Sequence, residues 1–182
     1  DPVDGADVGV HAVPDPRSRV RLDRVAARVD LVLRPRAARA DRGVVLVAGS
    51  GPTEVPVMLY DIPGRTAVAI ATDTMLRLAE HPRIVAVKDA KGDLTASARV
   101  IAQTDLAYYS GDDAMTLPLL SVGAVGVVGT STHFSAVGTK QLIEAYLDGE
   151  VATALRLHQQ LLPIYTGVFA TQGCILVKAG LK

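Results

Sequence analysis

Residues 84–94, IVAVKDAKGDL, join a short apolar segment to a charged turn and the start of a helix. Ile84–Val87 is apolar at four consecutive positions, as expected for a strand of a parallel sheet that is covered on both faces. Asp93 lies where a carboxylate can cap the first turn of the following helix. The stretch therefore predicts one strand–helix unit, with Lys88 where the strand ends.

Units of the same kind lie on both sides of this stretch. Apolar segments bounded by glycine, proline or polar residues predict strands at Val55–Ile62, Leu106–Tyr109 and Val125–Val128. Amphipathic segments between them complete a pattern that is typical of βα units around a parallel sheet. Four units in residues 53–182 make half of a closed (β/α)8 barrel, which needs roughly 250 residues. We therefore predict an α/β fold, a partial TIM barrel of about four βα units followed by carboxyl-terminal helices.

The last third of the chain is predicted to be helical. One apolar stripe ends at Asp148-Gly149, and a longer stripe after it predicts a helix of about five turns. The residues of the longer stripe are Val151, Leu155, His158, Leu162, Tyr165 and Phe169. A further helical element begins near Gln172.

Composition and charge exclude several classes of protein. The 19 basic and 19 acidic residues give a formal net charge of zero, so the chain lacks the positive field that nucleic-acid binding requires. The single cysteine, Cys174, allows neither an internal disulfide nor a zinc site made of cysteines, and this favours a reducing, cytoplasmic environment. Residues 114–139 carry no formal charge, but Pro118, several glycines and polar residues interrupt them, so no membrane partner is expected.

Lys88 is the strongest candidate for catalysis. A lysine at the carboxyl end of a strand lies at the edge where α/β barrels carry their catalytic groups. Burial there lowers the pKa of the ammonium and yields the neutral amine that attacks a carbonyl to form a Schiff base. The alternatives are a lysine with its ammonium in solvent and a lysine paired with Asp89.

Two other strand ends carry polar groups. Arg65 follows the first strand in YDIPGRT (residues 60–66), where its guanidinium could hold a substrate carboxylate or be solvated. SGDD (residues 110–113) ends the third strand, where Gly111 permits close backbone approach to a ligand and Asp112 is a further substrate-binding candidate. For the two carboxylates we favour helix capping over metal binding, because no histidine or third carboxylate lies at ligand spacing.

Taken together, residues 60–66, 84–94 and 110–113 closely resemble, in order and spacing, the carboxyl-terminal half of the 4-hydroxy-tetrahydrodipicolinate synthase (dihydrodipicolinate synthase) family. The resemblance covers residues 53–182, and its tail is similar to actinobacterial members. It implies a lyase of the Schiff-base aldolase group that condenses pyruvate with aspartate 4-semialdehyde on the route to diaminopimelate and lysine. It further implies a cytoplasmic homotetramer that needs no cofactor or metal ion.

The resemblance also implies roles for individual residues. Lys88 would form the imine with pyruvate, Arg65 would bind the carboxylate of the semialdehyde, and the backbone of Val128 would contact bound pyruvate. The chemistry agrees with these residue types, because an imine acidifies the pyruvate methyl group and the resulting enamine can attack an aldehyde held by Arg65.

Residues 1–52 do not share the resemblance. They use nine residue types and contain nine Arg and seven Asp but no Lys or Glu. Val44–Ala48 is the only segment there that predicts a strand, and the family's Gly-Thr-Thr-Gly-Glu loop and Tyr-Tyr pair, which supply the pyruvate carboxylate site and a proton relay, are absent. We therefore expect a domain boundary at residues 52 and 53, a poorly ordered, out-of-frame segment before it, and impaired activity in the chain as given.

Two alternatives remain open. A sister Schiff-base aldolase, such as an N-acetylneuraminate lyase or a keto-deoxy sugar acid aldolase, shares the lysine and the barrel, although Arg65 argues against it. A non-catalytic half-barrel remnant would instead associate with another chain through its exposed strand edges.

Overall fold

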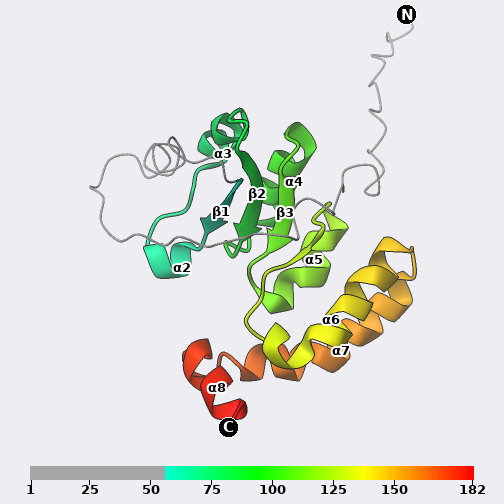
Figure 1. The fold of residues 1–182 in the computed structure, drawn as a ribbon. Coiled ribbons are helices and arrows are strands. Elements are labelled where there is room, and N and C mark those ends of the chain that lie inside the picture. The colour runs from blue at the N-terminus through cyan, green and yellow to red at the C-terminus, as the bar shows by residue number, and fades with distance from the viewer. Residues whose placement is uncertain (1–55) are drawn as a thin grey trace, which may run out of the picture.

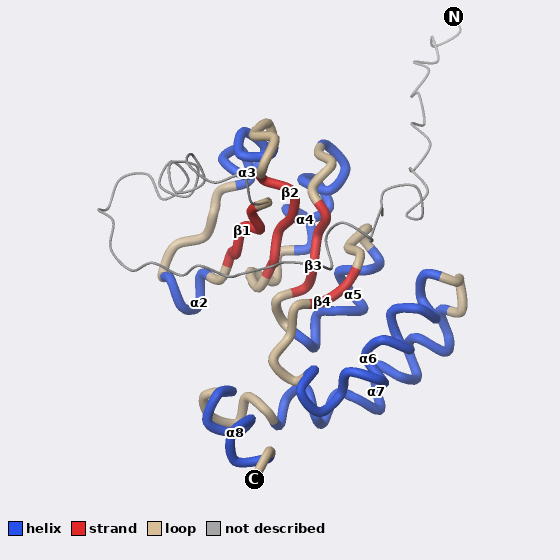
Figure 2. The backbone as a smooth tube through the Cα atoms, in the orientation of Figure 1, coloured by secondary structure: helices blue, strands red, loops and turns tan. Residues whose placement is uncertain are grey.

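The computed structural model describes residues 56–182 (Figures 1 and 2). The strands are β1 (Val57–Asp61), β2 (Ile84–Asp89), β3 (Ala107–Ser110) and β4 (Gly126–Val127). The helices are α2 (Pro63–Thr66), α3 (Thr72–Ala79), α4 (Leu94–Gln103), the 3-10 helix η2 (Asp113–Met115), α5 (Thr116–Ser121), α6 (Thr132–Leu147), α7 (Val151–Gly167) and α8 (Gly173–Gly180). The predictions for residues 1–52, including the strand at Val44–Ala48, lie outside the described residues.

The strands form one parallel sheet in the order β1-β2-β3-β4. Helices connect each strand to the next, and α6, α7 and α8 follow the last strand (Figure 2). The predicted fold class, four βα units of a partial barrel followed by carboxyl-terminal helices, is confirmed. Each observed strand end lies within two residues of its predicted position, and the largest extension carries β2 past Lys88 to Asp89.

A buried apolar row fixes the register of the first three strands. Leu59 pairs with Val87, and Val87 pairs with Tyr108, and each of these side chains is at most 1% exposed. Helices α3, α4 and α5 cover this row with further buried side chains, namely Met75, Leu78, Val100, Ile101 and Leu119. Because side chains alternate along a strand, the residues next to the row point to the opposite face of the sheet.

Local signals begin and end the helices. The carboxylate of Asp93 accepts a hydrogen bond from the backbone N–H of Ala96 at 3.0 Å, which confirms the predicted cap of α4. The turn between α6 and α7 falls at the predicted Asp148-Gly149. Gly149 has a φ of +86°, a conformation that favours glycine over residues with a side chain.

Helices α6 and α7 pack side by side as an antiparallel pair (Figure 1). A chain of buried hydroxyl groups lies in this region: Ser131 Oγ is 3.4 Å from Ser135 Oγ, which is 3.1 Å from Thr139 Oγ1. Thr139 Oγ1 in turn is 2.9 Å from Tyr165 Oη on α7. Leu142, also on α6, is fully buried and adds apolar packing to this helix.

The face of α7 that is covered differs from the predicted stripe. Ala154 and Tyr165 on α7 are buried, as is Val168 directly after its end. Four residues of the predicted stripe are exposed, namely Val151, Leu155 and Leu162 on the helix and Phe169 just beyond it. Helix α7 is apolar on two overlapping faces, and it turns the one that carries the Tyr165 hydroxyl toward α6. The period of the sequence therefore predicted the helix correctly and its buried face only in part. None of the helices in residues 56–182 is long and apolar enough to cross a membrane.

Replacement of Leu142 by alanine should destabilise the chain. The change removes a fully buried side chain from α6, which typically lowers the free energy of unfolding by about 2–5 kcal/mol. Val137→Ala on the same helix is the matched control, because Val137 is 73% exposed and its loss should change stability by less than about 0.5 kcal/mol. Urea unfolding followed by circular dichroism measures both, and equal effects would contradict the packing described here.

Candidate functional site

Three side chains form a row on the face of the sheet opposite the apolar row. Lys88 on β2 pairs with Tyr60 on β1 and with Tyr109 on β3. The ammonium nitrogen of Lys88 lies 4.2 Å from the centre of the Tyr60 ring. All three side chains are half-buried, at the carboxyl end of the strands.

This environment changes the proton affinity of the row. Burial lowers the pKa of the Lys88 ammonium, and the carboxylate of Asp113 opposes that shift in part. Burial raises the pKa of the Tyr60 phenol, which the positive charge of Arg65 offsets in part, and burial also raises the pKa of Tyr109. The site therefore favours a neutral amine next to phenols that keep their protons.

Asp89 does not neutralise Lys88. Its carboxylate lies on the reverse face, where Oδ1 accepts a hydrogen bond from the backbone N–H of Lys91 at 2.8 Å and Oδ2 accepts one from Ser97 Oγ at 2.6 Å. The alternative of a Lys88–Asp89 pair therefore has no support in the geometry.

Arg65 lies on the one-turn helix α2, directly after β1, and its side chain is exposed. The Arg65 side chain is thus exposed to solvent on the turn that directly follows Tyr60-Asp61, at the carboxyl end of β1. Such a position leaves its five donors available to an anionic group that approaches Lys88 from solvent.

Gly111 lies beside Lys88, and Asp112 caps the 3-10 helix that follows. A Cβ at Gly111 would come within 3.0 Å of Lys88 Cγ and of Ala90 Cβ, so the glycine makes room for the lysine side chain. Asp112 is exposed and accepts a hydrogen bond from the backbone N–H of Ala114 at 3.0 Å, which is the capping role that the sequence favoured for this pair of carboxylates.

Asp113 joins the site to the loop after β4. Its carboxylate is 1% exposed, and Oδ2 accepts hydrogen bonds from the backbone N–H groups of Thr130 and Ser131 at 3.2 and 3.4 Å. A Cβ at Gly129 would overlap Oδ1, so the glycine allows this approach. Val128 begins the loop, is 39% exposed, and donates its backbone N–H to Ser110 O at 2.8 Å.

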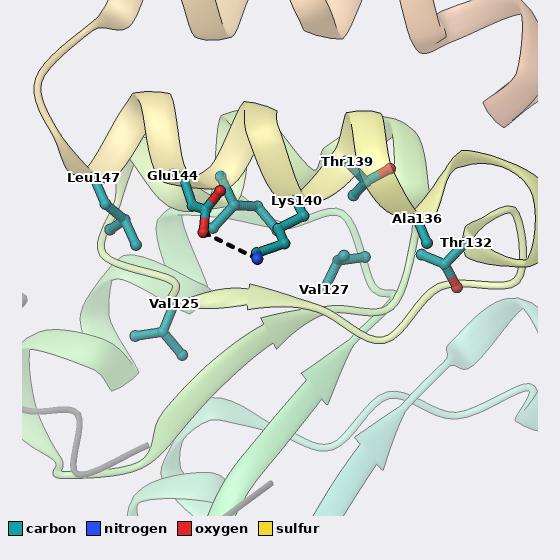
Figure 3. Close-up of a pocket in the computed structure, with 9 residues that line it drawn as sticks. Val125, Val127, Thr132, Ala136, Thr139, Lys140, Glu144 and Leu147 are labelled. Atoms are coloured by element: carbon teal, nitrogen blue, oxygen red, sulfur yellow. Dashed lines mark ion pairs between the residues drawn. The ribbon is translucent and has the colours of Figure 1, made fainter. Parts of the chain in front are cut away.

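An apolar groove of about 340 Å³ lies away from this row, between the edge strand β4 and helix α6 (Figure 3). Val125, Val127, Ile143 and Leu147 are among its lining residues, and an ion pair joins Lys140 Nζ and Glu144 Oε1 at 3.5 Å on the helix side. Neither Lys88 nor Arg65 contributes to the groove. Within residues 56–182, no group of three or more His, Cys, Asp or Glu side chains is arranged to hold a metal ion.

Residues 47–182 match the Dihydrodipicolinate synthetase family. The chain belongs to this family. A 4-hydroxy-tetrahydrodipicolinate synthase of Acidothermus cellulolyticus is 66% identical over 130 residues, which are 71% of this chain and 42% of that protein. One from Cutibacterium acnes is 60% identical over 129 residues, 71% of this chain and 44% of that protein. The predicted family and its actinobacterial type are confirmed, and the chain spans less than half the length of these curated relatives.

Solved structures agree with the fold. The dihydrodipicolinate synthase of Aquifex aeolicus is 29% identical with a TM-score of 0.74, and the match covers 78% of this chain and 50% of that one. The enzyme of Cyanidioschyzon merolae, solved with lysine bound, is 38% identical with a TM-score of 0.73 over 79% and 51% of the two chains. The family members are TIM barrels, and the present chain corresponds to part of one.

The sequence analysis missed Tyr60 and Asp113 as members of the site. The sequence does contain a pattern that points to Tyr60. The first two strands end alike, in Tyr60-Asp61 and Lys88-Asp89, and aligning the two aspartates predicts that Tyr60 lies next to Lys88. Asp113 offered no such signal, because nothing in its local sequence separates it from Asp112.

Lys88 should react with amine reagents at lower pH than an ordinary lysine. Its lowered pKa leaves more free amine at a given pH, so the midpoint of its labelling should fall below 10.5, the pKa of an ordinary lysine. Competitive labelling with a limiting acylating reagent, read by peptide mass spectrometry, measures this. Lys140, whose side chain is 73% exposed, reports reagent activity in the same samples. A Lys88 midpoint at or above 10.5 would contradict the desolvated site.

Proposed function

We propose that this chain carries the pyruvate-activating half of a 4-hydroxy-tetrahydrodipicolinate synthase, with Lys88 as the imine-forming residue. The observation that carries the proposal is the half-buried Lys88 amine at the carboxyl end of β2, 4.2 Å from the centre of the Tyr60 ring. Membership of the family supports the overall reaction, a lyase-type condensation in lysine and diaminopimelate biosynthesis.

The first step uses the amine and a phenol. The neutral amine of Lys88 attacks the keto carbon of pyruvate, and loss of water from the carbinolamine gives the imine. The departing hydroxyl needs a proton, and Tyr60, whose ring lies beside the Lys88 amine, is the proposed donor, because its raised pKa keeps the phenol protonated at neutral pH. Loss of a proton from the former methyl group then gives the enamine.

The second step forms the carbon–carbon bond. The enamine carbon attacks the aldehyde carbon of aspartate 4-semialdehyde, whose carboxylate Arg65 binds, and the aldehyde oxygen takes up a proton. Water or the substrate's own amino group then releases Lys88 from the imine. The backbone at Val128 is the proposed contact with bound pyruvate, with Gly111 and Asp112 at the neighbouring strand end.

Two further properties belong to the same proposal. The chain works as part of a homo-oligomer in the cytoplasm and uses no cofactor besides the covalent imine. The 182-residue chain alone turns over poorly, because the family's Gly-Thr-Thr-Gly-Glu loop does not occur in it and its Tyr108-Tyr109 pair lies on β3, a later strand than the one that carries the family's Tyr-Tyr pair. Normal turnover by the purified chain would contradict that last statement.

Pyruvate and borohydride should trap an adduct on Lys88 in the 182-residue chain. Reduction converts the imine to a stable secondary amine, which peptide mapping by mass spectrometry locates. Lys88→Arg should abolish the adduct, whereas Lys140→Arg, at an exposed position, should leave it unchanged. Tyr60→Phe should slow its formation by about 10²-fold, the usual contribution of a positioned proton donor. Absence of any adduct would support the non-catalytic remnant instead.

Arg65→Ala should separate the synthase from a sister aldolase. Addition of aspartate 4-semialdehyde to the pyruvate adduct before reduction should shift the trapped species to the mass of the condensed product. Loss of the guanidinium should leave the pyruvate adduct intact and slow this shift at least about tenfold, as expected for loss of a charge-assisted bond. Unchanged condensation in Arg65→Ala would show that the synthase assignment is wrong.

A further inference from the structure

A buried cluster of charges lies on the reverse face of the sheet, directly behind the Tyr60–Lys88 pair. Asp61 and Asp89 are the next residues along β1 and β2, and they pair with each other across the two strands. Each is 1% exposed. Two carboxylates are thus buried within one residue of the reactive amine, on the side that faces the helices.

Lys91 connects the two carboxylates. Its backbone N–H donates to Asp89 Oδ1 at 2.8 Å, and its ammonium lies 3.3 Å from Asp61 Oδ2 with only 12% of the side chain exposed. The other oxygens have backbone or hydroxyl donors, since Ile70 N–H donates to Asp61 Oδ1 at 3.1 Å and Ser97 donates to Asp89 Oδ2. Among the described residues, Asp61 Oδ2 has no hydrogen-bond partner besides this ion pair, so the Lys91 ammonium is its compensating charge.

The same cluster ties the strand ends together. The N–H of Ala90, between Asp89 and Lys91, donates to the backbone oxygen of Asp61 at 2.8 Å. This bond extends the pairing of β1 and β2 beyond the last register pair. The position of the Lys91 side chain therefore depends on the same β1–β2 alignment that sets Tyr60 beside Lys88.

Charge balance gives this arrangement a consequence for Lys88. Two buried carboxylates with one cation leave a net charge of −1, and without the cation they leave −2. An uncompensated buried carboxylate favours any nearby ammonium over the neutral amine. The groups that face Lys88 from neighbouring elements are Tyr60 on β1, Tyr109 on β3 and the carboxylate of Asp113 on η2, and Asp113 already acts in that sense.

We propose that Lys91 is a positioning residue for Lys88, neutralising the buried Asp61 carboxylate and aligning the ends of β1 and β2 so that Lys88 presents a neutral amine beside Tyr60. The catalytic role of this arrangement rests on the proposed function. The protonation of the Lys88 amine, however, can be measured without any substrate.

The experiment measures the pH dependence of Lys88 labelling in the full 182-residue chain, by the competitive method described above. Lys91→Met should raise the midpoint by about one pH unit, which is about tenfold less free amine at a given pH. Lys91→Arg keeps the charge and should restore a midpoint near that of the unmodified chain. Asp61→Asn combined with Lys91→Met removes both charges of the pair and should also return the midpoint close to its original value.

Each outcome decides the proposal. A folded Lys91→Met chain with an unchanged Lys88 midpoint overturns it, and so does a double variant whose midpoint stays raised. If Lys91→Met fails to fold by circular dichroism, Lys91→Gln takes its place as the variant that removes the charge and keeps Asp61, and its Lys88 midpoint must then be raised. Pyruvate trapping in the same samples distinguishes a failure of the proposed function from a failure of the proposal about Lys91. A missing adduct in the unmodified chain counts against the proposed function alone.

Discussion

The pairing of Leu59, Val87 and Tyr108 in one buried row is the constraint on which the rest of the molecule depends. A slip of one residue in any of these strands would move its apolar side chain from the helix-covered face to the open face. The cost of exposing such side chains therefore fixes the alignment of β1, β2 and β3. Side-chain alternation then carries this alignment over to the residues at the strand ends.

That alignment produces two chemically different faces from adjacent residues. Tyr60, Lys88 and Tyr109 lie half-buried on one face, while Asp61 and Asp89 are fully buried on the other. The open face has room for a substrate and still removes enough water to lower the pKa of the lysine. The closed face holds the opposing charges, where helix α4 and Lys91 satisfy them. The candidate reactive amine and the buried ion pair therefore lie on opposite faces of the same sheet.

The sequence predicted what depends on local pattern. The four strands, the cap at Asp93, the helical tail and the candidate residues Lys88 and Arg65 follow from apolar runs, spacing and family motifs. Cross-strand neighbours were missed, because the contact of Tyr60 with Lys88 is a property of register that no single segment contains. The covered face of α7 was predicted only in part for a similar reason, since the choice between two overlapping apolar faces is made by its partner α6.

In the turn after β3, the adjacent residues Asp112 and Asp113 have different structural roles. Asp112 points to solvent and caps the short helix η2, whereas Asp113 points inward and holds the backbone at Thr130 and Ser131. Ser131 is also the first hydroxyl of the chain that ends at Tyr165. Asp113 therefore acts on the Lys88 amine and, through continuous hydrogen bonds, on the α6–α7 pair. The carboxyl-terminal helices α6 and α7 are in this way connected to the loop at which the proposed pyruvate site lies.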